Sequence, residues 1–150
     1  MDKLYSSENL CKLLYYNEEN PIVQPILMNP KETLEYVKIF PYPKDTKIID
    51  EASSILIVGF DNFKAISNNN FIGSLLYFKI LCHNSLLRLD TGRRTYQIMN
   101  EIANLFNGQK LMGIGRLVFA GGGEINDGND EYSGFELAYK IMEFGKNFTG

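Results

Sequence analysis

Apolar residues between positions 93 and 106 recur with the period of an α-helix. They stand at i, i+1, i+4, i+7 and i+8 counted from Ile98, which makes one continuous stripe along a helix. Asp90 or Thr91 is the expected N-cap, and Gly108 is the expected residue after the last turn. We expect this helix to pack on a sheet through Ile98, Ile102 and Phe106.

A shorter stripe in residues 7–16 predicts an N-terminal amphipathic helix, capped by Ser6 or Ser7. An extended stretch follows from Asn17 to Pro30, and all five prolines of the chain fall between positions 21 and 43. One helical turn is expected from Pro30, because proline suits the first helical position. The stretch also contains apolar residues that we expect to be buried, namely Ile22, Val23, Ile26, Leu27 and Met28.

Elsewhere the apolar positions alternate, which is typical of strands. The clearest case is residues 71–89, joined by a turn at Asn68–Asn70 to a strand at 53–63 in an antiparallel hairpin. A strand at 37–40 runs into Pro41 and Pro43, so its pairing should end there or lie at a sheet edge. Two further strands are expected at 111–120 and 131–144. One face of the 71–89 strand should carry Leu76, Phe78, Ile80 and Cys82, and the other Tyr77, Lys79, Leu81 and His83.

The predicted order of elements is α-β-β-β-α-β-β. Because consecutive strands imply hairpins, the fold class is α+β, with a mainly antiparallel sheet and one long amphipathic helix packed on it. A chain of 150 residues fits a single domain, 1–150. Within it, residues 1–45 form the N-terminal helix and proline-rich segment, and residues 46–150 form the sheet-plus-helix core. A long, glycine-rich, acidic loop at 121–130 should join the last two strands.

Charge and composition narrow the classes of function. The formal net charge is -3 and the pI about 5.2, whereas a nucleic-acid binder usually carries a basic patch. The N-terminus lacks the apolar core of a signal peptide, and no apolar run reaches the ~18 residues of a membrane span. The two cysteines, Cys11 and Cys82, have neither CxxC nor zinc-finger spacing. We therefore expect a protein made and folded in a reducing cytosol, without a cofactor or a metal.

The candidate catalytic and ligand-binding motifs lack the geometry or the residue pattern that their chemistry requires. Cys82 and His83 are neighbours on a predicted strand, so their side chains point to opposite faces and cannot form a dyad. The Gly113–Gly115 pair lacks the third glycine of a dinucleotide fingerprint, and the Gly121–Gly123 run lacks the GK[ST] ending of a phosphate loop. The acidic loop at 124–131 fails the alternation of an EF-hand. No catalytic residue is predicted, and we expect a binding protein rather than an enzyme.

Charged and aromatic residues in predicted turns are candidates for an interface with other proteins. Asp50 and Glu51 fit a solvated turn better than an acid–base pair. The three arginines around the start of the long helix could meet acids on a partner or could serve as solubilising charge, and both interpretations stay open. The candidate interface residues are Arg88, Arg93, Arg94, Tyr42, Asp50, Glu51, Glu124, Asp127 and Asp130.

The element order and several segments resemble the tail terminator (tail completion) proteins of long-tailed bacteriophages. The shared pattern is a short N-terminal helix, a proline-punctuated entry, a strand meander, one amphipathic helix and a closing hairpin. The sequence is also similar to those of small neck proteins from phages with low-GC Gram-positive hosts. The segments that carry the resemblance are Leu13–Tyr16, Lys38–Lys44, Phe78–His83, Tyr96–Phe106 and Leu111–Gly115.

This resemblance implies a virion protein, assembled in the host cytoplasm, that forms a ring, commonly a hexamer, on the head-proximal end of the tail tube. The ring would stop growth of the tube and meet the head-completion or portal complex, with DNA passing through its channel. An acidic lumen would let DNA slide, whereas a basic one would grip it. Aromatic residues beyond the needs of one sheet face fit a protein built around interfaces. The alternatives are a head-closure protein, or a small cytosolic ligand-binding or adaptor domain.

Overall fold

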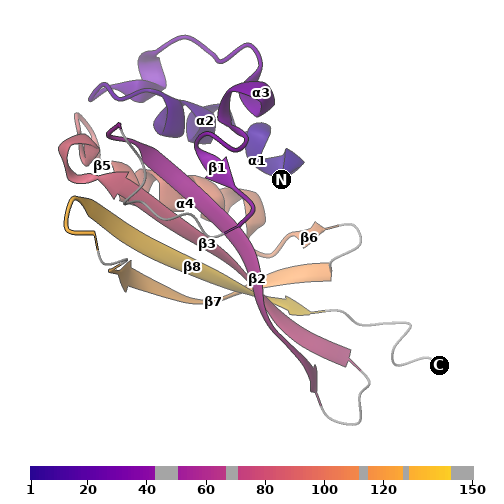
Figure 1. Cartoon of the computed structure of the whole chain (residues 1–150). Helices are drawn as coiled ribbons and strands as arrows, with labels where there is room; N and C mark the ends of the chain where they lie inside the picture. The colour runs from indigo at the N-terminus through magenta and orange to yellow at the C-terminus, as the bar shows by residue number, and fades with distance from the viewer. Residues whose placement is uncertain (43–50, 67–70, 112–114, 127–128, 143–150) are drawn as a thin grey trace.

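The computed structural model describes residues 1–42, 51–66, 71–111, 115–126 and 129–142, and it is an α+β fold as predicted (Figure 1). Six strands form one mostly antiparallel sheet in the order β1-β2-β3-β8-β7-β6. These strands are β1 (Ile39–Phe40), β2 (Ser54–Ile66), β3 (Phe71–His83), β6 (Lys110–Leu111), β7 (Gly115–Ile125) and β8 (Tyr132–Met142). The remaining elements are α1 (Asp2–Tyr5), α2 (Glu8–Tyr15), α3 (Pro30–Leu34) and α4 (Arg94–Phe106), two 3-10 turns at Pro21–Val23 and Asn84–Leu86, and a small pair of strands, β4 (Arg88–Leu89) and β5 (Gly92–Arg93).

Helix α4 packs on β3 and β8 through the predicted stripe. Ile98, Ile102 and Phe106 are buried, and the ring of Phe106 lies 4.9 Å from that of Phe78 on β3. The helix ends at Phe106, and Asn107 is its C-cap. Gly108 follows with a φ of 73°, a left-handed conformation that glycine adopts without strain. The sheet face under the helix carries the residues expected there, since Leu76, Phe78, Ile80 and Cys82 all belong to the main buried cluster.

The N-terminal helices complete this core. Helix α2 begins after Ser7, whose side chain accepts a hydrogen bond from the Leu10 backbone amide at 3.2 Å, as its predicted capping role requires. Its buried side chains include Leu10, Leu13 and Leu14, and the helix contacts α4 and β2. The opposite face of the sheet holds a second, smaller cluster around Phe40, Ile55, Ile57, Leu81 and Tyr132.

Two predictions about the chain before α4 are wrong. Strand β3 ends at His83, because the chain turns through Asn84–Leu86 instead of continuing to residue 89. Neither Asp90 nor Thr91 caps the helix, since both lie between the paired strands β4 and β5. The N-cap is Arg93, whose side chain makes no capping hydrogen bond.

The glycine-rich stretch is also different from the prediction. Gly121, Gly122 and Gly123 lie inside β7 and pair with Ala138, Leu137 and Glu136 of β8, so they do not belong to a loop. A β-bulge after Phe119 precedes them, and Gly121 has a φ of 150° there. A Cβ atom at Gly122 would lie 2.5 Å from the Glu136 carbonyl oxygen, so close approach of the two strands requires glycine at this position.

The first strand departs from the expected antiparallel meander. Strand β1 pairs with β2 in parallel, with Ile39 opposite Leu56 and Phe40 opposite Ile57. It is only two residues long and lies at the sheet edge, in agreement with the limit that Pro41 sets on pairing.

Arg94 is fully buried, which corrects its assignment to an exposed interface. It is the first residue of α4, and its guanidinium donates hydrogen bonds to four backbone carbonyl oxygens. The distances are 2.8 Å to Leu86, 2.5 Å to Leu13, 2.8 Å to Tyr16 and 2.8 Å to Glu18. Burial lowers the pKa of this guanidinium, but arginine stays charged because its ordinary pKa is very high. Arg94 therefore ties the end of α2 and the chain after it to the start of α4.

We expect Arg94→Met to lower the free energy of unfolding by about 3 kcal/mol or more, because it removes the donors of several buried carbonyl groups at once. Arg94→Lys should also destabilise, since one ammonium group cannot reproduce the fork of a guanidinium. Urea denaturation measures both changes. Arg88→Met is the matched control at an exposed arginine and should shift the free energy by less than about 0.5 kcal/mol. Equal effects at positions 88 and 94 would contradict the role given to Arg94.

Candidate functional site

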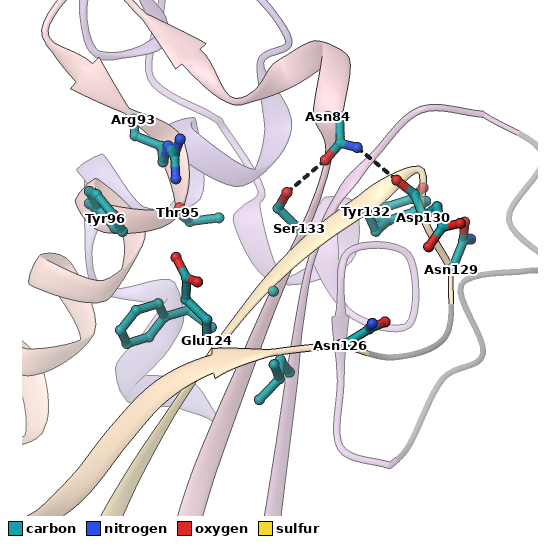
Figure 2. Close-up of a pocket in the computed structure, with 13 residues that line it drawn as sticks. Asn84, Arg93, Thr95, Tyr96, Glu124, Asn126, Asn129, Asp130, Tyr132 and Ser133 are labelled. Atoms are coloured by element: carbon teal, nitrogen blue, oxygen red, sulfur yellow. Dashed lines mark hydrogen bonds between the residues drawn. The ribbon is translucent and has the colours of Figure 1, made fainter.

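An open cavity of about 280 Å³ lies between the start of α4 and the adjoining ends of β7 and β8 (Figure 2). It brings together three of the residues that the sequence nominated for an interface, namely Arg93, Glu124 and Asp130. Arg93 comes from β5, Glu124 from β7, and Asp130 from the chain just before β8. These positions are up to 37 residues apart in the chain (130 minus 93), so only the fold makes them neighbours.

Aromatic rings support the arginine side of the cavity. The Arg93 guanidinium lies over the Tyr96 ring, 5.3 Å from its centroid, and Tyr96 makes an edge contact with Phe135 at 6.2 Å. A cation held on an aromatic face keeps its hydrogen-bond donors available for a ligand or a partner. In Figure 2 the carboxylate of Glu124 points toward this same side, near Thr95. The wall therefore presents both signs of charge on a rigid aromatic support.

Hydrogen bonds fix the opposite side of the cavity. Asn84 donates from Nδ2 to the Asp130 carbonyl oxygen at 2.8 Å, and Ser133 donates from Oγ to Asn84 Oδ1 at 2.7 Å. The Tyr132 amide donates to the Asn129 carbonyl oxygen at 3.1 Å. These bonds hold the start of β8 against the turn after β3 (Figure 2).

The cavity is lined mainly by polar side chains. Its lining contains neither the cysteine nor the histidine side chains of this chain, so no nucleophile–base pair of that kind faces it. Among the described residues, no three His, Cys, Asp or Glu side chains gather closely enough to hold a metal ion. The lining combines amide, hydroxyl and charged groups with three aromatic rings, those of Tyr96, Tyr132 and Phe135.

Cys82 and His83 lie on opposite faces of the sheet, as predicted. Cys82 is fully buried in the main cluster, and burial raises the pKa of its thiol to about 11. His83 is half-buried on the other face, where its ring makes an edge contact with Tyr132 at 5.2 Å. Its Nδ1 lies 2.8 Å from Ser85 Oγ, and its Nε2 lies 3.9 Å from a Glu131 carboxylate oxygen. The two side chains therefore do not form a catalytic dyad.

The other candidate interface residues are scattered. Arg88 and Glu51 are exposed, and Tyr42 is exposed beside Tyr36, with ring centroids 6.2 Å apart. Asp50 and Asp127 lie outside the residues that the structure describes. A role of these positions in binding stays a prediction.

The exposure of apolar residues in the N-terminal segment is a feature that the sequence did not predict, and Ile22 is one of these residues. Val23, Ile26 and Met28 were expected to be buried, but 75%, 63% and 88% of their surface is exposed. Backbone carbonyls hold this stretch instead, since Lys12 Nζ donates to Ile22 at 3.0 Å and the Tyr16 hydroxyl donates to Pro25 at 2.7 Å. Phe60 on β2 and Val118 and Phe119 on β7 are also exposed, on strands that β3 and β8 separate. The sequence signal that could have indicated exposed residues in the N-terminal segment is the mixture of prolines and apolar residues there.

Comparison with known proteins gives one family. The family model of YomW matches residues 7–141, which include nearly every element of the fold. YomW is a gene product of an SPBc2-type phage, so the match indicates a phage origin. Comparison with curated proteins gives no significant match. No helix in the described part of the chain is both long and apolar enough to cross a membrane.

Burial predicts that both cysteines are unreactive in the folded protein. It raises the pKa of Cys11 and of Cys82 to about 11, so almost no thiolate forms at pH 8. A thiol reagent such as DTNB should label neither residue at pH 8, and should label both in urea. Asn104→Cys places an exposed control thiol on α4 and should react at once.

The same pKa values set the direction of a pH dependence. A pKa that folding raises contributes stability below the pKa of the unfolded thiol, about 8.5, and this contribution is lost as the pH rises toward 11. Replacing both cysteines by alanine should flatten the decline in stability over that range in urea titrations. If the decline in stability with rising pH is unchanged, titratable groups other than the two cysteines cause it.

Proposed function

The chain belongs to the YomW family, and from this premise we propose that it is a structural protein of a tailed-phage virion, the subunit of a tail terminator ring. The ring, a hexamer in the proteins that the sequence resembles, caps the tail tube. It joins the tube to the head-completion protein on the portal side. DNA passes through its channel without sequence-specific contacts.

The exposed apolar surface is the observation that carries this proposal. Val23, Ile26 and Met28 are exposed in the N-terminal segment, Phe60 is exposed on β2, and Val118 and Phe119 are exposed on β7. Exposed apolar surface that gathers in large patches marks contact with other chains. A ring subunit needs at least two such surfaces, one for each neighbour. Further surfaces serve the components above and below the ring.

Charge supports the passage of DNA rather than its capture. The chain has a net charge of -3, so a ring of identical copies carries a net negative charge and repels the phosphate backbone on average. Arg93 and Arg88 are exposed, but Glu124 and Asp130 accompany Arg93 at the cavity. Such mixed patches suit contacts with proteins, and we assign the cavity to the head-side partner.

The rival functions fit the geometry less well. A ligand-binding domain is expected to have a pocket of about 300–1,000 Å³ with mainly apolar walls, whereas this cavity is smaller, open and lined largely by polar residues. A head-closure protein would be a smaller β-barrel, and the long helix α4 across the sheet argues against it.

Removing the gene from the phage that encodes the chain tests the proposal. We expect lysates with DNA-filled heads and separate tails of irregular length, because an uncapped tube keeps adding subunits. Electron microscopy counts joined particles and measures tail lengths. Expression of the chain from a plasmid is the control and should restore intact virions.

Normal virion yield in the deletion strain would overturn the proposal. So would heads that fail to fill with DNA while the tails keep one length, since that outcome places the protein in head assembly.

A further inference from the structure

Arg93 and Glu124 bring opposite charges to the same cavity, but they do not pair with each other. Both side chains line the cavity, and both are exposed. Among the described residues, neither side chain forms a hydrogen bond or an ion pair. Figure 2 shows the two on the same side of the cavity. The donors of Arg93 and the carboxylate oxygens of Glu124 are therefore available to another molecule.

Aromatic packing fixes where these two charges lie. The Arg93 guanidinium lies 5.3 Å from the centroid of the Tyr96 ring, and Tyr96 contacts the Phe135 ring on β8. Phe135 is the register partner of Glu124 on β7, so the contacts from the cation to the carboxylate run through two rings. The neighbouring residue Arg94 is held by buried hydrogen bonds, which fix the backbone at Arg93. The fold thus keeps the two charges at set positions.

Charges of opposite sign at set positions recognise a partner that carries both signs in the complementary order. A carboxylate accepts two parallel hydrogen bonds from the fork of an arginine such as Arg93. An ammonium or a guanidinium group pairs with a carboxylate such as that of Glu124. Asp130 also lines the cavity, so the lining has one positive and two negative residues. A partner with an anion alone would meet two acids, and a partner with a cation alone would meet Arg93.

We propose that the cavity receives an acid–base pair from the surface of the head-side protein, with the partner's carboxylate on Arg93 and its ammonium or guanidinium group on Glu124. This inference rests on the proposed function, which assigns the cavity to that protein, and it names the chemistry of the contact. Complementary charges guide the encounter of two proteins and set their orientation, because a wrong orientation places like charges together. The cavity therefore fixes the orientation in which the head meets the ring.

Charge reversal at the two positions tests the contact. Each variant is expressed from a plasmid during infection by the deletion strain, and electron microscopy counts intact virions and measures tail lengths. We expect Arg93→Glu and Glu124→Lys each to lower the number of intact virions about tenfold or more, because each places like charges opposite one another. Tail lengths should stay normal, since the ring still caps the tube while the heads remain separate.

A double variant that carries both reversals distinguishes a partner from an internal ion pair. If Arg93 and Glu124 acted only on each other, exchange of their charges would restore the yield of the wild type. We expect no recovery, because the charges of the partner stay in their original order. Mutations that restore infectivity to phage carrying Arg93→Glu should replace an acid by lysine or arginine in one head-side protein.

Lys31→Glu and Glu32→Lys are the matched controls. Both positions are exposed on α3, which contributes no residue to the cavity, and the changes in charge are the same. Both variants should restore virions as well as the wild type does. Melting temperatures within about 4 °C of the wild type establish that each variant is folded.

The remaining outcomes separate this inference from the proposed function. If the wild-type plasmid restores no virions, the proposed function is wrong. If the wild type and both single reversals restore virions equally, the function stands and the contact at the cavity is wrong. If only one reversal lowers the yield, the partner presents a single charge and the acid–base pair is wrong. Irregular tails in the folded variants would place the contact inside the ring instead of on its head side.

Discussion

The position of the N-terminal third of the chain depends on one buried cation. Arg94 stands at the first turn of α4 and bonds to carbonyl oxygens of Leu13, Tyr16, Glu18 and Leu86. A charge of this kind is costly to bury, and only several good acceptors together offset the lost hydration. The same side chain sets where α4 begins and where the chain leaves α2. Arg93, Thr95 and Tyr96, which lie around it in the chain, then line the cavity.

The rest of the molecule divides into a well-packed side and two exposed regions. Helices α2 and α4 cover one sheet face with a continuous core, while Val23, Ile26 and Met28 at one end and Phe60, Val118 and Phe119 on the sheet stay exposed. The buried core gives a stable scaffold, and the exposed residues are the surfaces that the proposed assembly would use.

The part of the fold that follows from side-chain periodicity could be predicted from the sequence. The stripe at Ile98, Ile102 and Phe106 and the alternation through Phe78 and Cys82 are local patterns that burial enforces. Arg93 and Arg94 are identical neighbours, and only the carbonyls of a distant segment decide which of them is buried. Likewise, Gly121–Gly123 has the composition of a loop, but pairing with β8 overrides it. Arg93, Glu124 and Asp130 were nominated one by one, and their shared cavity depends on tertiary packing.

The bonds of Arg94 also bear on the order in which the chain folds. Leu13 and Arg94 are separated by 81 positions, so this contact closes a long loop and has a large entropic cost. During synthesis the N-terminal segment leaves the ribosome well before α4 exists to receive it. Until α4 is synthesised, the apolar residues of this segment lack the core on which they pack in the folded protein. We therefore expect the segment to dock only after α4 has been synthesised.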